Sequence, residues 1–246
     1  MKATGRFLAH SSVLLAPVLY AQGLYARAKI SKLPEADGPR RGSVRGGSNV
    51  LRLLLLGEST VAGVGAANHD EGLAGRTARA VSAMTGATVD WRVHAANGIT
   101  AAGLRSSLSS LPADTRADLF VIGLGANDVF RLHGPGRWER ELKGLVNDVR
   151  ERCGFAPLII SAMPPIGSFP GLPQPLRSVL GLRSRLLDDT TEKLARKMAS
   201  VHYLPFDLDI VPDLFSADGI HPSTQCYELW GSAIAESAID YLPTRG

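Results

Sequence analysis

Cysteine is scarce in this chain of 246 residues. Its two cysteines, Cys153 and Cys226, form no CxxC pair and lack the histidine spacing of a zinc site, so the sequence predicts no metal. We expect both to be free, buried thiols. The sequence also predicts no cofactor: glycines follow the first apolar strand, as in nucleotide-binding proteins, but neither G-x-G-x-x-G nor a lysine-bearing phosphate loop is present.

A long block of one charge is also missing. The chain has 27 Lys and Arg against 23 Asp and Glu, a net charge of +4 that is spread along the sequence. This mild excess does not favour nucleic-acid binding, for which basic residues gather on one face or in one run. With 45% apolar residues, the length fits one domain with a sizeable core.

No apolar run is long enough for a clear membrane span. The uninterrupted run from Val13 to Ala21 contains Pro17 and is short against the roughly 20 residues that cross a bilayer. Basic residues flank it, at Lys2 and Arg6 before and at Arg27 after. We therefore treat residues 1–33 as an N-terminal apolar segment that either contacts a membrane surface or forms a helix on the rest of the protein.

Those alternatives leave the location open between membrane-associated and cytoplasmic. In the second, the helix packs its apolar side chains on the domain: Leu14, Leu15, Val18 and Leu19. A secretory signal is a third reading, because Ala26-Arg27-Ala28 has the spacing of a cleavage site, although with a charge inside it.

An α/β fold is predicted for residues 49–246. Residues 34–48 are rich in glycine, proline and charge and lack apolar periodicity, which predicts a linker. Beyond it, apolar strands alternate with helical patterns. The five strands are Val50–Leu56, Thr88–Ala95, Leu119–Leu124, Leu158–Ala162 and Val201–Leu204, and the helices are Gly72–Met84, Ala101–Leu111, Arg137–Arg152, Leu176–Ala199 and Thr224–Tyr241.

Such an order predicts a parallel sheet covered by helices on both faces, because strands such as Leu53–Leu56 are apolar on both sides. Ligands of parallel sheets bind at the carboxyl ends of the strands. The proline-rich loop from Pro164 to Pro175 follows the fourth strand, and we expect it at that edge, either as part of a substrate pocket or as a stiff connection.

Polar residues at the same edge point to acyl-transfer chemistry. Ser59 follows the first strand in a sharp turn, and Asp218 precedes His221 by three residues, a spacing that lets the carboxylate orient the imidazole. Singly, Ser59 fits a helix N-cap and the Asp-x-x-His turn fits a helix start before Pro222. Gly98 and Asn127 follow the second and third strands, where a backbone N–H and an amide can stabilise an oxyanion.

Taken together, these blocks resemble the SGNH hydrolases, or GDSL esterases and lipases, over about residues 50–242. The resemblance implies a three-layer α/β/α sandwich with a five-stranded parallel sheet, the flavodoxin-like SGNH fold. It implies Ser59 as nucleophile, His221 as base and Asp218 as its orienting acid. The oxyanion donors it implies are the Ser59 amide, Gly98 and Asn127.

Two positions depart from the family pattern. The usual Gly-Asp-Ser-Leu reads Gly57-Glu58-Ser59-Thr60, and an asparagine common two residues before Gly98 is Ala96. The implied activity is hydrolysis of a small-molecule ester or lipid of the esterase, lipase or lysophospholipase type. A thioesterase or a carbohydrate O-deacetylase would use the same residues, and a catalytically silent, membrane-anchored binding protein is the alternative of another class.

Overall fold

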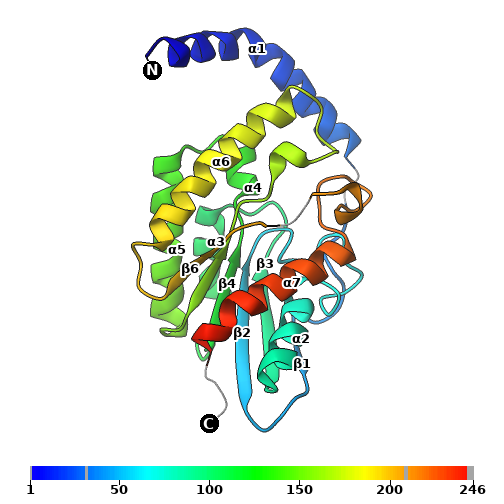
Figure 1. The fold of residues 1–246 in the computed structure, drawn as a ribbon, viewed down its shortest axis with the longest axis vertical. Helices are drawn as coiled ribbons and strands as arrows, with labels where there is room; N and C mark the ends of the chain where they lie inside the picture. The colour runs from blue at the N-terminus through cyan, green and yellow to red at the C-terminus, as the bar shows by residue number, and fades with distance from the viewer. Residues whose placement is uncertain (1, 31–32, 208–209, 243–246) are drawn as a thin grey trace.

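Six strands form one sheet in the computed structural model, which describes residues 2–30, 33–207 and 210–242, with side chains from residue 15 onward. The spatial order is β1-β3-β2-β4-β5-β6 (Figure 1). Neighbours from β3 to β6 run parallel, and β1 pairs antiparallel with β3 at one edge. The strands are β1 Arg41–Val44, β2 Val50–Gly57, β3 Thr88–Ala95, β4 Leu119–Gly123, β5 Leu158–Ser161 and β6 Val201–Leu204.

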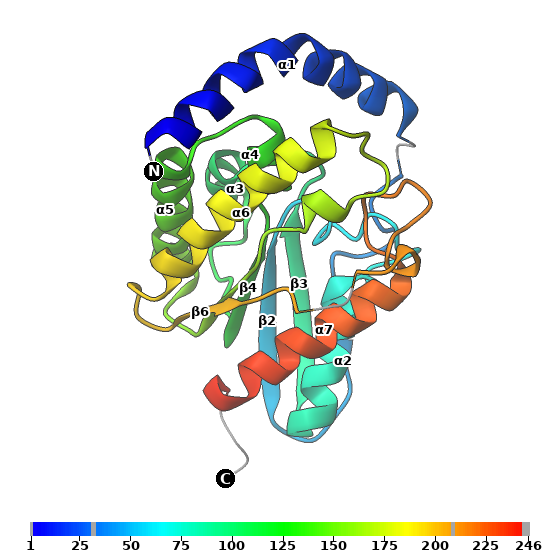
Figure 2. The same cartoon turned by 45° about the horizontal axis from the view of Figure 1, so that its top comes forward.

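Helices cover both faces of this sheet, and Figures 1 and 2 show α2 and α7 on one side with α3, α5 and α6 on the other. Alternate residues of β2 divide between the two cores: Leu53 and Leu55 face α2 and α7, whereas Leu54 and Leu56 face the other layer. Both faces are therefore dry, which explains the continuous leucine run. The helices are α1 Lys2–Lys29, α2 Leu73–Thr85, α3 Ala101–Ser107, α4 Ala126–Phe130, α5 Pro135–Cys153, α6 Leu176–Ala195 and α7 Thr224–Ala238.

Local sequence fixes where the helices begin and end. Gly86 ends α2 in the left-handed conformation (φ 68°) and donates its N–H to Ser82, as glycine does after many helices. Ser223 begins α7 by accepting a hydrogen bond from the Cys226 N–H at 3.3 Å. The predicted α/β class and layered order are confirmed.

The sheet differs from the prediction in having six strands. The extra strand, β1, lies inside residues 34–48, which the sequence predicts to be a linker. Its short, half-exposed sequence Arg-Gly-Ser-Val carries no apolar pattern, so it is a strand because β3 offers it a free edge. At Gly42 the backbone lies under the indole of Trp91, where a side chain would collide with the ring.

Helix α1 lies along α6 at the upper end of both views (Figures 1 and 2). Ala26 is buried and Leu19 is half-buried against the α5 and α6 side of the core, whereas Leu15 and Val18 are exposed. Leu14, Leu15, Val18 and Leu19 were predicted to pack on the domain. The side chain of Leu14 lies outside the described residues, and of the other three only Leu19 packs on the core. None of the helices, as far as they are described, is apolar over a length that would span a bilayer. The expectation for the cysteines is confirmed: Cys153 and Cys226 are buried and unpaired.

Candidate active site

The predicted polar residues gather where β2, β3 and β4 end. Gly57 of β2 lies directly opposite Gly123 of β4, so these two strands end together. A side chain at Gly57 would collide with the Gly123 carbonyl oxygen at 2.0 Å. This close approach requires glycine and brings the turn after β2 beside the loop after β4.

Ser59 lies in the turn after β2 and is 8% exposed. The turn is closed by hydrogen bonds from Ala62 N–H to the Glu58 carbonyl, at 2.9 Å, and from Val64 N–H to the Ser59 carbonyl, at 3.0 Å. The Ser59 backbone is therefore fixed at the sheet edge.

Asp218 and His221 form a closed hydrogen-bonded turn before α7. His221 Nδ1 lies 2.6 Å from Asp218 Oδ2, and Asp218 Oδ1 accepts the N–H groups of Ile220 and His221 at 2.9 and 3.0 Å. Burial raises the pKa of the carboxyl group, but the hydrogen bonds from the His221 ring and the two N–H groups outweigh burial and lower the pKa of Asp218. An ionised Asp218 keeps the proton of His221 on Nδ1, which leaves Nε2 free as a base.

One cavity of about 150 Å³ joins the two halves of the site. Ser59, Asn127 and His221 all line it, although no direct hydrogen bond joins Ser59 and His221 in the described part of the chain. Asp218 lies behind His221. Gly98 is not among the described residues that form the wall, but its neighbour Asn97 is. Most of the rest is apolar: Phe130, Pro164, Pro165, Phe169, Phe206, Ile210, Leu214, Phe215, Ile220 and Trp230.

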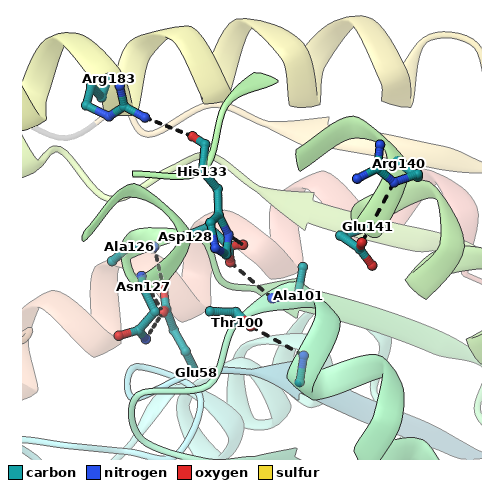
Figure 3. Close-up of polar contacts among 11 residues, drawn as sticks. Glu58, Thr100, Ala101, Ala126, Asn127, Asp128, His133, Arg140, Glu141 and Arg183 are labelled. Atoms are coloured by element: carbon teal, nitrogen blue, oxygen red, sulfur yellow. Dashed lines mark hydrogen bonds and ion pairs between the residues drawn. The ribbon is translucent and has the colours of Figure 1, made fainter. Parts of the chain in front are cut away.

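Glu58, one of the two positions that depart from the family pattern, binds the first residues of α4, Ala126 and Asn127 (Figure 3). Its carboxylate accepts the N–H groups of Ala126 and Asn127 at 2.8 and 3.1 Å and also the side-chain amide of Asn127. Burial raises the pKa of Glu58 to about 7, although these N–H donors favour the charged form. One Asn127 amide hydrogen is thereby taken by Glu58, which leaves the other for a ligand.

Behind Asn127, the carboxyl group of Asp128 links the starts of α3 and α4 (Figure 3). Its Oδ2 accepts the N–H of Ala101, at the start of α3, at 3.0 Å, and its Oδ1 lies 2.7 Å from His133 Nδ1. The Arg183 guanidinium in turn donates to the His133 carbonyl at 3.0 Å. Helices α3 and α4, which follow β3 and β4, are therefore joined through a carboxyl group that is 1% exposed.

The structure thus brings Ser59, Asn127, Asp218 and His221 to one place and puts Gly98 at its margin. Sequence reasoning also pointed to the loop after β5, and Pro164, Pro165 and Phe169 of that loop do line the cavity. It missed Phe206, Ile210 and Trp230, since no motif marks them. It noted Glu58 only because a glutamate stands where the family usually has an aspartate. Its place directly before Ser59 was the one sign in the sequence that Glu58 belongs to the site.

No group of three histidine, cysteine, aspartate or glutamate side chains suited to a metal ion occurs within residues 15–30, 33–207 and 210–242. The polar residues that line the cavity include Glu58, Ser59, Thr60, Asn97, Asn127 and His221, and their hydroxyl, imidazole and amide groups suit proton transfer and oxyanion binding.

A known protein family and a known protein match the sequence of this chain. The model of the GDSL-like Lipase/Acylhydrolase family matches residues 55–229. A GDSL-like esterase of Mycobacterium tuberculosis is 30% identical over an alignment of 233 residues. The match covers 86% of this chain and 73% of that protein.

Two solved structures share the fold at lower identity. The crystal structure of TesA aligns with a TM-score of 0.63 and 22% identity, over 78% of this chain and 99% of the other. The inhibitor-bound aryl esterase of M. smegmatis aligns with a TM-score of 0.62 and 21% identity, over 78% of this chain and 100% of the other. The family match covers more than half of the chain, and the chain belongs to the GDSL-like lipase/acylhydrolase family and is a carboxylic ester hydrolase.

Proposed function

We propose that the protein cleaves carboxylic esters through an acyl-enzyme on Ser59, with His221 as the base and Asp218 as its orienting acid. The observation that carries this proposal is the 2.6 Å contact between Asp218 and His221 beside a cavity that Ser59 also lines. His221 Nε2 takes the hydroxyl proton as Ser59 Oγ bonds to the ester carbonyl carbon. The C–O bond to the alcohol then breaks, and the alcohol leaves with that proton.

Water completes the reaction on the acyl-enzyme. His221 removes a proton from the water, whose oxygen attacks the acyl carbon, and the proton returns to Ser59 Oγ as the acid departs. The oxyanion of each tetrahedral intermediate is held by the N–H groups of Ser59 and Gly98 and by the Asn127 side-chain amide. Glu58 supports this role of Asn127, because it orients the amide with its nitrogen on the Glu58 side.

The cavity wall supports an apolar acyl group as the substrate class. Phe206, Phe215 and Trp230 are among its ring-bearing members, and such surfaces gain free energy by excluding water from a hydrocarbon chain. An acetylated sugar would place hydroxyl groups against this wall without partners, so we favour esterase or lysophospholipase action over deacetylation. A thioester with the same acyl chain fits the cavity equally. Rates for p-nitrophenyl esters of increasing chain length test this assignment, and a preference for acetate on sugars would contradict it.

The decisive experiment compares wild type with Ser59→Ala in p-nitrophenyl ester hydrolysis. We expect a loss of about 10³-fold or more in kcat, since the acyl-enzyme no longer forms. Ser106→Ala, which changes an exposed serine of α3, is the matched control and should retain wild-type activity. A fluorophosphonate probe should label wild type and not Ser59→Ala. Equal hydrolysis by the two proteins would refute the mechanism.

We also propose that α1 contacts a lipid surface. Among the side chains of this helix that the structure describes, from residue 15 onward, five large apolar ones are exposed: Leu15, Val18, Tyr20, Leu24 and Tyr25. Its last turn carries Arg27 and Lys29. Such a combination suits reversible binding to an anionic membrane. Co-sedimentation with vesicles containing anionic lipid tests it: replacing Leu15, Val18 and Leu24 with serine should reduce binding and leave p-nitrophenyl ester hydrolysis intact. Unchanged sedimentation would refute this proposal.

A further inference from the structure

Residues 34–40, which connect α1 to β1, form polar contacts with the loop that carries Gly98. Glu35 Oε1 accepts the backbone N–H of Asn97 at 2.6 Å. The other oxygen of Glu35 pairs with the Arg40 guanidinium, which also donates to the carbonyl of Ala95, the last residue of β3. One ion pair therefore binds both the end of β3 and the loop beyond it.

The same segment contacts the loop that follows Ser59. The Ala36 N–H donates to the Ala62 carbonyl at 3.1 Å, and the Asp37 N–H donates to the Ala67 carbonyl at 3.2 Å. Gly63 has a φ of +74°, and a side chain there would meet the Ala36 methyl group at 2.6 Å. Residues 34–40 therefore lie against both loops that supply backbone groups to the site.

The Gly98 loop has few other restraints. Gly98 has a φ of +78° and no heavy atom within 4 Å of the place where its Cβ would be. The neighbouring backbone bonds, from Ala96 N–H to Gly57 and from Ile99 N–H to Ala96, are both 3.3 Å long. Glu35 makes the shorter contact, directly next to Gly98. The position of the Gly98 N–H therefore depends on this carboxylate.

We propose that Glu35 and Arg40 are positioning residues for the Gly98 N–H in the oxyanion site. The inference rests on the oxyanion role of Gly98 in the proposed function. Both residues lie outside residues 55–229, the part that matches the family model. An oxyanion donor must lie close to where negative charge develops, and misplacing such groups by about 1 Å costs roughly 100-fold in rate.

A second ion pair of the same construction gives the control. Asp118 accepts the backbone N–H of Arg52 at 2.9 Å and pairs with its guanidinium. Side-chain exposures are nearly equal: 44% and 29% for Arg40 and Glu35, 53% and 26% for Arg52 and Asp118. Asp118 precedes β4 and so lies at the opposite end of the strands from the site. Such exposed pairs add little to stability. The two pairs therefore differ chiefly in which part of the backbone they restrain: the loop beside Gly98 or the opposite end of the strands.

The test compares Glu35→Ala, Glu35→Gln and Asp118→Ala in the full chain. We expect Glu35→Ala to lower kcat about 10- to 100-fold with KM changed less than about twofold, since ground-state binding does not use the oxyanion donor. Glu35→Gln should recover much of the loss, because its amide oxygen still accepts the Asn97 N–H. Asp118→Ala should match Glu35→Ala in melting temperature and retain wild-type kcat. A Glu35→Ala enzyme with wild-type kcat would overturn the proposal.

Amide hydrogen exchange gives a readout that does not depend on activity. Glu35→Ala should speed exchange at Asn97, whereas Asp118→Ala should leave that amide unchanged; unchanged exchange in Glu35→Ala would overturn the positioning role. Failure of the proposed function has a different signature, namely ester hydrolysis by wild type that persists in Ser59→Ala. The two failures are therefore separable.

Discussion

The two sides of the cavity each hold a buried carboxyl group, and the two groups differ in what compensates their charge. Asp218 is 6% exposed and Glu58 is 2% exposed, yet the pKa of Asp218 is lowered and that of Glu58 is raised to about 7. Asp218 faces the His221 imidazole, which becomes positive in the proposed reaction. Glu58 faces only neutral N–H donors, with the Asp128 carboxyl group nearby.

This difference separates the tasks of the two groups. An imidazolium beside Asp218 gains stability when the proton moves from Ser59, so Asp218 acts on the charge that forms at the base. Glu58 touches no group that changes charge in the proposed reaction, and it orients donors toward the oxyanion instead. Variants on the Asp218 side should therefore cost more activity than variants on the Glu58 side.

The largest effect is expected for Asp218→Asn. The asparagine keeps the shape of the turn but can place an N–H opposite His221 Nδ1, which favours the wrong imidazole tautomer, so kcat should fall about 10⁴-fold. Steady-state kinetics with p-nitrophenyl esters measure the change. Asp213→Asn, an acid five residues earlier outside the contact with His221, is the control. If Asp218→Asn lowered kcat less than a Glu58 variant does, the Glu58 side of the cavity would contribute more to the reaction than the Asp218 side.

Removing the oxyanion amide comes next. Asn127→Ala should lower kcat about 10²- to 10³-fold with little change in KM, because the amide acts on the transition state. Asn147→Ala, on the exposed side of α5, should retain wild-type activity. Fluorophosphonate labelling of Ser59 should slow in parallel, since the phosphonyl oxygen would occupy the same place. Rates equal to wild type would remove Asn127 from the site.

Glu58→Gln tests the other half of the comparison. The substitution puts an amide donor against the N–H groups of Ala126 and Asn127, so we expect kcat to fall about 10- to 100-fold. The acid limb of the wild-type pH profile should also be steeper than that of Glu58→Gln, because only the wild type takes up a proton on Glu58 there. Glu228→Gln, an exposed acid on α7, is the control. Identical pH profiles would contradict an ionised Glu58 in the active form.

The free energy of unfolding should also change with pH as Glu58 titrates. An acid whose pKa is raised in the folded state holds its proton more tightly there, so its contribution to stability is lost as pH rises from 4.5, its ordinary value, through about 7. Over that range the free energy of unfolding of wild type should fall relative to Glu58→Gln by on the order of 3 kcal/mol. Urea denaturation across the range measures it. Parallel curves for the two proteins would show that Glu58 titrates normally.

The sequence predicted the sheet well where strands are apolar on both faces. Leu119–Leu124 and Leu158–Ala162 match β4 and β5 to within one residue, because continuous apolar runs between turn residues have few other structures open to them. Strand β1 escaped prediction, since Arg41–Val44 has no alternation of its own and pairs with a strand about 50 residues away. Pairing over such a distance leaves no local signal.

The site divides in the same way. Ser59, Asn127 and His221 follow strands or precede a helix in a set order, and the structure places them around one cavity. Glu35 lies in a segment whose composition predicts a linker, and Phe206 and Ile210 lie in coil. Their positions depend on tertiary packing, which composition does not encode. Motifs therefore located the residues to which we assign the reaction, but not those that surround or hold them.

The smallest loss of activity is expected for His133→Ala, which acts behind Asn127. His133 contacts the Asp128 carboxyl group but not the cavity, and Asp128 still accepts the Ala101 N–H in the variant. Leaving one buried oxygen without its partner should cost about 1–3 kcal/mol of stability, while kcat changes less than about threefold because Glu58 still orients Asn127. Arg183→Ala removes the hydrogen bond to the His133 carbonyl and should lower both the free energy of unfolding and kcat less than His133→Ala does. If His133→Ala lowered kcat as much as Glu58→Gln, the Asp128 network would share the orienting role that we give to Glu58 alone.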